Sequence, residues 1–131
     1  MAGISCVVVT PEATVLEESA DFVVLPLFDG EMGIAGSHSP MIGRLGYGEL
    51  RLKSGSSVQR FYVDGGFVEV VGNVVTVLTN QAIPAGEVDT DQSREQLSDA
   101  QKLPATTPEQ YDIRERRVAQ SRAKIRIGER K

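Results

Sequence analysis

Residues 25–40, LPLFDGEMGIAGSHSP, are the stretch on which the fold prediction depends. They continue an apolar, β-like run at residues 22–25 and contain the sequence's single histidine, His38. The pair Asp29-Gly30 is a strong tight-turn signal, because glycine adopts positive φ without steric cost. Two more glycines and two prolines divide the rest of the stretch, so we expect only short extended segments within it.

Outward from this stretch, short apolar runs alternate with turn residues. Residues 4–9 are rich in β-branched side chains, and residues 49–53 alternate polar and apolar side chains as a half-buried strand does. Gly65-Gly66 and Gly72-Asn73 are read as turns. The expected strands are residues 4–9, 13–16, 21–27, 32–35, 41–45, 49–53, 58–63, 67–71, 74–78 and 81–83. So many short strands with regular turn signals predict an all-β sandwich or flattened barrel.

The pattern changes after residues 83–86, Ile-Pro-Ala-Gly, where helical spacing replaces alternation. Asp89 or Thr90 can cap a first helix, because a short side-chain oxygen accepts from the free N–H groups of the first turn. Pro104 ends this helix at about Leu103. The sequence therefore predicts a β-sandwich over residues 1–86 and a helical hairpin over residues 87–131.

The second helix of the hairpin has clear end signals and a thin apolar stripe. Thr107 is the expected N-cap, with Pro108 at the first helical position, and Gly128 is the expected stop. Tyr111 and Val118 lie seven residues apart on a helix that is otherwise mostly polar. We expect this hairpin to be loosely docked, or to use another protein to cover its apolar side chains.

The composition fits one domain, or one small domain with an appendage. The chain has 131 residues, of which 40% are hydrophobic and 5% aromatic, so Val, Leu and Ile should form the core. It contains no apolar run of about 18 residues and no basic start leading into an apolar stretch, so neither a membrane span nor a signal peptide is expected. The single cysteine, Cys6, excludes an internal disulfide and is read as a small buried hydrophobe.

Charge is distributed unevenly along the chain. Up to Glu87 there are four basic and ten acidic residues, a net charge of −6, whereas residues 88–131 carry a net charge of +2. An acidic β-domain disfavours nucleic acid, because phosphates require a cationic surface. A basic C-terminal segment often binds a partner, although a solvated charged helix has the same composition.

The sequence offers little support for catalysis. His38 has Asp29 and Glu31 nearby, but no second histidine exists to complete a typical hydrolytic metal site. Neighbouring serines do not make a catalytic triad, and the phosphate-binding motif G-x-x-x-x-G-K-[ST] is absent. A small metal-dependent enzyme centred on His38 remains an alternative, and no catalytic or metal-binding residue is assigned.

Four motifs in order carry a family resemblance: D-G-E-x-G-I at 29–34, G-x-H-x-P at 36–40, G-G-F-x-E-V at 65–70 and V-x-V-L at 75–78. Over roughly residues 4–83 the chain resembles the epsilon subunit of rotary, F-type proton-translocating ATP synthase. This resemblance implies a non-catalytic subunit of the central stalk, the rotor that couples c-ring rotation to ATP synthesis in the catalytic head. The implied partners are the gamma subunit, the c ring and the alpha and beta subunits. The implied location is peripheral, on the cytoplasmic face of the bacterial membrane or the stromal face of the thylakoid.

The resemblance also implies site residues. The expected contacts to the c ring and stalk are Asp29, Gly30, Glu31, Met32 and His38. Some bacterial epsilon subunits bind ATP through I/L-D-x-x-R-A, which makes Asp91 and Arg94 candidate ATP ligands. Here Thr90 and Glu95 depart from that motif, and Glu95 adds negative charge near the phosphates, so no cofactor is expected. On residue types alone, Asp91 and Arg94 can instead pair with each other on one helix face.

The second helix carries a cluster of basic residues that the resemblance implies can contact the catalytic head and inhibit ATP hydrolysis. Partly shielded guanidinium–carboxylate pairs are strong and directional, so an acidic partner surface would suit this helix. A free-standing adaptor with a basic partner-binding helix is the other alternative. The cluster comprises Arg114, Arg116, Arg117, Arg122, Lys124 and Arg126.

Overall fold

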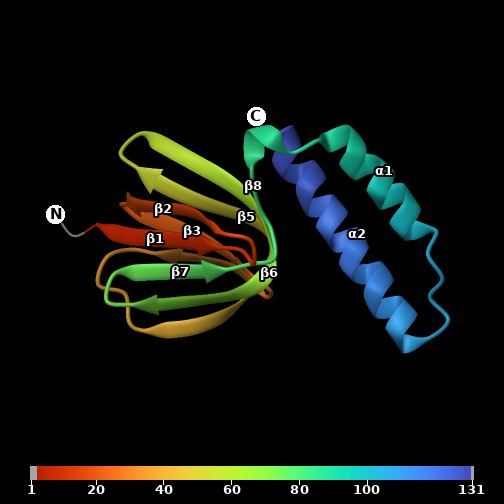
Figure 1. The fold of residues 1–131 in the computed structure, drawn as a ribbon, viewed down its shortest axis with the longest axis horizontal. Helices are drawn as coiled ribbons and strands as arrows, with labels where there is room; N and C mark the ends of the chain where they lie inside the picture. The colour runs from red at the N-terminus through yellow and green to blue at the C-terminus, as the bar shows by residue number, and fades with distance from the viewer. Residues whose placement is uncertain (1–2, 131) are drawn as a thin grey trace. The chain divides into compact units, whose positions relative to one another are not determined.

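The computed structural model describes residues 3–130, which form two compact units (Figure 1). One unit ends at Pro84 and consists of strands, and the other begins at Ala85 and consists of helices. The predicted fold class, a β-sandwich followed by a helical hairpin, is confirmed. The strands are β1 (Ile4–Val9), β2 (Thr14–Ala20), β3 (Phe22–Leu27), β4 (Gly30–Ile34), β5 (Met41–Ser54), β6 (Ser57–Val71), β7 (Val74–Leu78) and β8 (Ala82–Pro84).

The strands are hydrogen-bonded in the order β2-β1-β7-β6-β5-β3-β4, and β8 pairs with β6. Two long strands, β5 and β6, pair with each other along their length and have different neighbours at their two ends. The later part of β6 pairs with β7, as in Phe67 opposite Leu78, and the earlier part pairs with β8, as in Tyr62 opposite Ile83. β5 and β6 therefore pass from one layer to the other and fold the sheet into a sandwich.

The prediction that Gly65-Gly66 forms a turn between two strands is wrong, as is the division of β5 into two strands. The β5–β6 register runs from Leu45 opposite Gly66 to Tyr47 opposite Asp64, so both strands continue through a bend. Gly65 and Gly66 have φ of 69° and 106°, and a Cβ at Gly66 would lie 1.9 Å from the Leu78 carbonyl oxygen. The glycine pair thus bends a continuous strand against its neighbour instead of reversing the chain.

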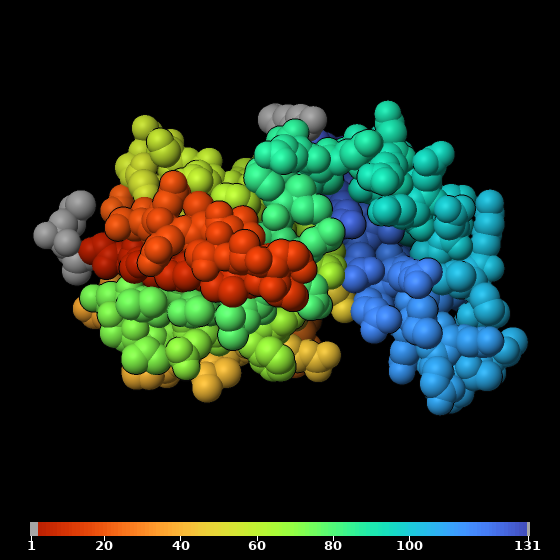
Figure 2. Space-filling model, viewed as in Figure 1, coloured from red at the N-terminus to blue at the C-terminus, as the bar shows by residue number. Residues whose placement is uncertain are grey.

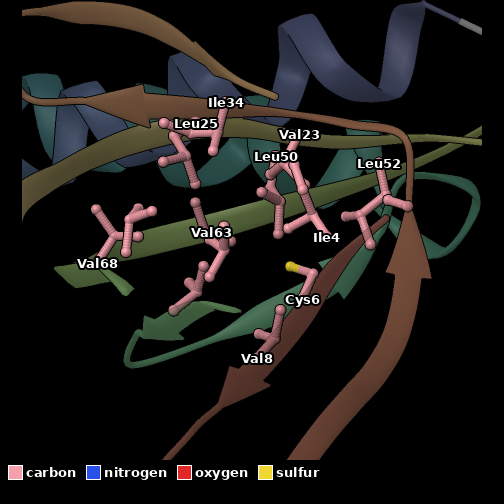
Figure 3. Packing of buried hydrophobic residues seen from close by; sticks show 14 of the residues in the cluster. Ile4, Cys6, Val8, Val23, Leu25, Ile34, Leu50, Leu52, Val63 and Val68 are labelled. Carbon is pink, nitrogen blue, oxygen red and sulfur yellow. The ribbon is translucent and has the colours of Figure 1, made fainter. Parts of the chain in front are cut away.

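The core lies between the layers, where aliphatic side chains from β1, β3, β4, β5 and β6 point toward one another (Figure 3). Cys6 is fully buried among them, and this burial, followed by the Glu18 charge, raises the pKa of its thiol to about 12. A thiol in this environment stays protonated and packs as an apolar group. Its expected role as a small buried hydrophobe is confirmed.

β1 and β7 are parallel neighbours, with Val7 opposite Thr76, although about seventy residues separate them in sequence. Their atoms lie side by side on the surface seen in Figure 2, where residues near the N-terminus are red and residues near 75 are green. This pairing completes the layer formed by β2, β1, β7 and the adjoining parts of β6 and β5. The outer surface of this layer is the candidate site described below.

The second unit comprises η1 (Ala85–Glu87), α1 (Thr90–Gln101) and α2 (Pro108–Glu129). The predicted caps are confirmed: Asp89 accepts from the backbone N–H of Gln92, and Thr107 forms a capping box with Gln110 ahead of Pro108. The predicted stop at Gly128 is wrong, because α2 continues through it. A Cβ at Gly128 would lie 2.2 Å from the Thr90 Cγ2 atom, so this glycine allows close helix packing. Within residues 3–130, no helix combines the length and apolarity that a membrane crossing needs.

Candidate functional site

The outer surface of the layer formed by β2, β1, β7 and parts of β6 and β5 is apolar. Because side chains alternate between the two faces of a strand, the register fixes which of them share this surface. One row crosses it from Arg44 through Phe67 and Leu78 to Val9, and the next crosses from Ile42 through Glu69 and Thr76 to Val7. We call this surface the apolar face; its residues are Val7, Val9, Ile42, Arg44, Phe67, Glu69, Val71, Val74, Thr76 and Leu78.

Large apolar side chains on this face are strongly exposed. Ile42 is 76% exposed and Phe67 57% exposed, and Val71, Val74 and Leu78 are also exposed. A contiguous patch of this kind on a soluble domain typically marks an interaction surface. At its margin the Arg44 guanidinium lies 5.6 Å from the ring centroid of Phe28, which is itself exposed.

The opposite outer surface of the sandwich, on the other halves of β5 and β6, is built from charged and aromatic side chains. Glu49 accepts from Arg51 at 3.0 Å and from Arg60 at 2.6 Å, and Arg51 also pairs with Glu31 at 3.1 Å. These four residues form a chain of ion pairs across β4, β5 and β6. We call this surface the charged face; its residues include Glu31, Glu49, Arg51, Lys53, Val58, Arg60 and Tyr62.

The buried carboxylate of the charged face, Glu49, is paired with cations of the same chain. The Glu49 side chain is only 5% exposed, and both of its carboxylate oxygens accept hydrogen bonds from guanidinium groups. The hydrogen bond to Glu31, with Glu49 contributing further, raises the pKa of Arg51 above its ordinary value. Tyr62 is fully buried and donates to Asp64 at 2.5 Å, and burial together with this hydrogen bond raises its pKa.

The residues expected to contact the c ring and stalk do not form one loop. Asp29 is exposed in the turn between β3 and β4, and Gly30 is exposed at the start of β4. This turn lies next to Arg44, whose carbonyl accepts from the Phe28 N–H at 3.0 Å. His38 lies beyond the other end of β4, in a loop whose Ser37 N–H donates to Asn73 at 2.6 Å.

Between these two ends, the neighbouring side chains of β4 point in different directions. Glu31 is exposed and lies on the charged face, where it pairs with Arg51. Met32 packs partly against the core. The five expected contact residues thus divide into an exposed acidic turn at residues 29–31, a core side chain, and a separate loop that carries His38.

His38 makes a local contact, with its Nδ1 2.7 Å from the Ser39 carbonyl oxygen, so this nitrogen acts as the donor. No group of three or more His, Cys, Asp or Glu side chains suited to a metal ion occurs in the part of the chain that the structure describes. The metal-dependent alternative therefore gains no support from the arrangement around His38.

In the helical unit, Asp91 and Arg94 pair at 3.3 Å, as their spacing allowed, and Arg94 also pairs with Glu129 of α2. A phosphate at Arg94 would compete with both carboxylates, so this geometry does not favour ATP binding there. Both residues are well exposed, with side-chain exposures of 95% for Asp91 and 49% for Arg94.

The basic residues of α2 do not share one environment. Arg116, Arg122 and Arg126 are exposed and Arg114 is half-buried. Arg117 and Lys124 line a groove of about 340 Å³ between α1 and α2. The structure therefore distributes the predicted cationic cluster around the helix instead of gathering it on one side.

Sequence reasoning missed the apolar face. The signal was present in residues 67–71, Phe-Val-Glu-Val-Val, and 74–78, Val-Val-Thr-Val-Leu, where both alternating sets of positions are largely apolar. A strand with one solvated face alternates, so a nearly continuous apolar run in an antiparallel sheet indicates a second buried surface. Arg44 and Ile42 of β5 form one edge of this face, and only the register places them beside Phe67 and Glu69.

These features define a class: a two-layer β-sandwich with an exposed apolar face, followed by a helical hairpin. The family described as "ATP synthase, Delta/Epsilon chain, beta-sandwich domain" matches residues 3–85. The chain is 50% identical to the ATP synthase epsilon chain of Rhodopirellula baltica, over 96% of this chain and 98% of that one. It is 41% identical to the epsilon chain of Desulfitobacterium hafniense strain Y51, over 92% and 91% of the two chains.

Among solved structures, the chain is similar to one from the Tetrahymena thermophila mitochondrial ATP synthase central stalk and c ring. The TM-score is 0.76 at 17% identity, over 95% of this chain and 96% of that one. This likeness shows a shared fold. The chain belongs to the ATP synthase epsilon-chain family, and it is a non-catalytic subunit of that complex. This assignment confirms the resemblance and replaces both alternatives, the free-standing adaptor and the metal-dependent enzyme.

Proposed function

We propose that this chain connects the gamma subunit to the c ring, so that proton-driven rotation of the ring reaches the catalytic head and drives ATP synthesis. The observation that carries the proposal is the apolar face, a large exposed surface that the sandwich does not cover with its own side chains. Such a surface suits a permanent partner better than a transient one, because permanent interfaces resemble a core cut in two. We assign the apolar face to gamma.

The two separated groups of predicted contact residues then have different partners. The exposed turn with Asp29, Gly30 and Glu31 faces a polar loop of the c ring. The His38 loop is tied to Asn73, directly beside Val71 and Val74 of the apolar face, and so lies at the border of the gamma contact. In this arrangement the complex lies on the cytoplasmic face of a bacterial membrane, or on the stromal face of a thylakoid.

Cysteine cross-linking in the assembled complex tests these assignments. We expect Glu31→Cys to cross-link to the c subunit and His38→Cys to cross-link to gamma. Ser56→Cys, in the exposed β5–β6 turn, serves as a control for random collision. Cross-linking of Glu31→Cys to catalytic-head subunits alone would contradict the placement of the turn, and equal yields at all three positions would contradict both assignments.

We also propose that the helical hairpin inhibits ATP hydrolysis by contacting an acidic segment of an alpha or beta subunit. Support comes from α2, whose 22 residues include exposed Arg116, Arg117 and Arg122, and would extend about 33 Å. Charge-assisted hydrogen bonds to carboxylates would stabilise such a contact, and salt would weaken it.

Two variants of the complex test this inhibition. Truncation after Leu103, and the triple change of Arg116, Arg117 and Arg122 to alanine, should each raise ATP hydrolysis while leaving assembly intact. Lys102→Ala, which removes an exposed cation outside α2, is the matched control. Unchanged hydrolysis in both test variants would show that these cations form only a solvated surface.

A further inference from the structure

We propose that Arg44 is a specificity-determining anchor of the apolar face and receives a carboxylate from the partner that docks there. The inference rests on the proposed docking of gamma to this face. It adds a chemical requirement: the docked segment must present an Asp or Glu side chain flanked by apolar side chains.

The apolar face contains a suitable groove beside Arg44. The groove has a volume of about 740 Å³ and is bordered by residues 9–11 at the end of β1 and by Phe67 and Leu78. Phe67 stands directly opposite Arg44 in the register, and Leu78 stands opposite Phe67, so the guanidinium lies at one end of a row of apolar side chains. A partner segment that fills this groove will also cover Arg44.

Arg44 differs from the other two guanidinium groups of the sandwich in its partners. Arg51 and Arg60 both pair with Glu49, and Lys53 lies over the Phe22 ring on the charged face. Within residues 3–84, Arg44 forms no ion pair with a carboxylate, and its guanidinium lies over the face of the Phe28 ring. It is also the only cation among the residues that define the apolar face.

Docking would remove water from this guanidinium. A buried charge without an acceptor is unfavourable, so an apolar surface alone would be a poor complement to this face. A carboxylate matches the planar guanidinium with two parallel hydrogen bonds, and the Phe28 ring already orients the group. Because the sandwich is acidic as a whole, one cation in the groove fixes where an acidic segment can dock.

The test compares five variants of the full chain for binding to purified gamma from the same enzyme, measured as a dissociation constant. We expect Arg44→Glu to weaken binding about 30-fold or more, as loss and reversal of a desolvated charge pair does. Arg44→Lys should weaken it less, because an ammonium group cannot form the bidentate pair. Lys53→Glu is the matched control: it reverses a ring-stacked cation on the charged face and should leave binding nearly unchanged.

The variant Ile42→Ser distinguishes a failure of the carboxylate inference from a failure of the docking assignment. If Ile42→Ser weakens binding while Arg44→Glu does not, gamma docks on the apolar face and the carboxylate inference is wrong. If neither variant weakens binding, the docking assignment itself is wrong. Both side chains are exposed, so the thermal unfolding midpoints should match that of the unmodified chain and exclude misfolding. Loss of affinity in Arg44→Glu, together with a shallower salt dependence in Arg44→Ala, supports the anchor.

Discussion

The two outer faces of the sandwich are built on the same pair of long strands, β5 and β6, but they differ in how their side chains are paired and covered. On the charged face, Glu49 is buried, and the guanidinium groups of Arg51 and Arg60 satisfy it. On the apolar face, Ile42 and Phe67 are exposed, and the sandwich supplies nothing to cover them. The Glu49 carboxylate on the charged face is paired within the chain, whereas the apolar face is left exposed, and we propose that another protein covers it.

The difference shows how to separate residues that stabilise the fold from residues that bind. Buried charges with full sets of partners contribute to the stability of the sandwich, because removing one partner leaves another charge unpaired. Exposed apolar side chains contribute little to folding and much to association. Substitutions on the charged face should therefore change unfolding, and substitutions on the apolar face should change binding.

The stability of the sandwich should be most sensitive to substitution at the bend of β6, which separates the two faces. Gly66→Ala places a Cβ against the Leu78 carbonyl at a backbone conformation with φ of 106°, so the strand must shift. We expect a loss of about 3 kcal/mol or more in the free energy of unfolding, or failure to fold. Gly3→Ala, with its nearest neighbour 3.7 Å away, is the control. Equal urea midpoints for the two variants would show that the bend tolerates a side chain.

Glu49→Ala should cause the next largest loss in the free energy of unfolding. It leaves Arg51 and Arg60 without their shared carboxylate in a mostly buried environment, at a cost of about 2–4 kcal/mol in the free energy of unfolding. Glu69→Ala, the matched change on the apolar face, removes an exposed carboxylate and should stay within about 0.5 kcal/mol. Urea unfolding measures both, and similar losses would remove the energetic distinction between the faces.

Glu31→Gln should change the free energy of unfolding only slightly. The Glu31 side chain is 57% exposed, and Arg51 keeps its contact with Glu49, so we expect less than about 1 kcal/mol. The same substitution should reduce any contact of this turn with the c ring. A loss as large as that of Glu49→Ala would mean that the ion-pair chain acts as one unit.

The local elements of the fold could be predicted because their signals are local. Residues 4–9 are rich in β-branched side chains, and Thr107 followed by Pro108 specifies a helix start. The bend at Gly65-Gly66 could not be told from a turn, because glycine permits both and only the contact with Leu78 decides between them. Gly128 was misread for the same reason, since its packing partner, Thr90, is 38 residues away in sequence.

The candidate site was only partly predictable. The motif around Asp29 and His38 indicated the family, but the sequence could not show that β4 separates the two residues. The apolar face depends on register, which places Arg44 beside Phe67 and Phe67 beside Leu78 across three strands. Propensity describes single strands and carries no information on these pairings.

The most direct test of the account introduces the same charged residue on each face. Phe67 on the apolar face is 57% exposed, and Val58 on the charged face is 49% exposed, so the fold should accept glutamate at both positions. We predict that Phe67→Glu weakens the affinity for gamma about 100-fold, because it removes a large apolar side chain from the docking surface and places a carboxylate beside Arg44, where it would occupy the guanidinium. Val58→Glu should change the affinity by less than about 2-fold. Full affinity in Phe67→Glu, or an equal loss in both variants, would contradict the assignment of the apolar face to gamma.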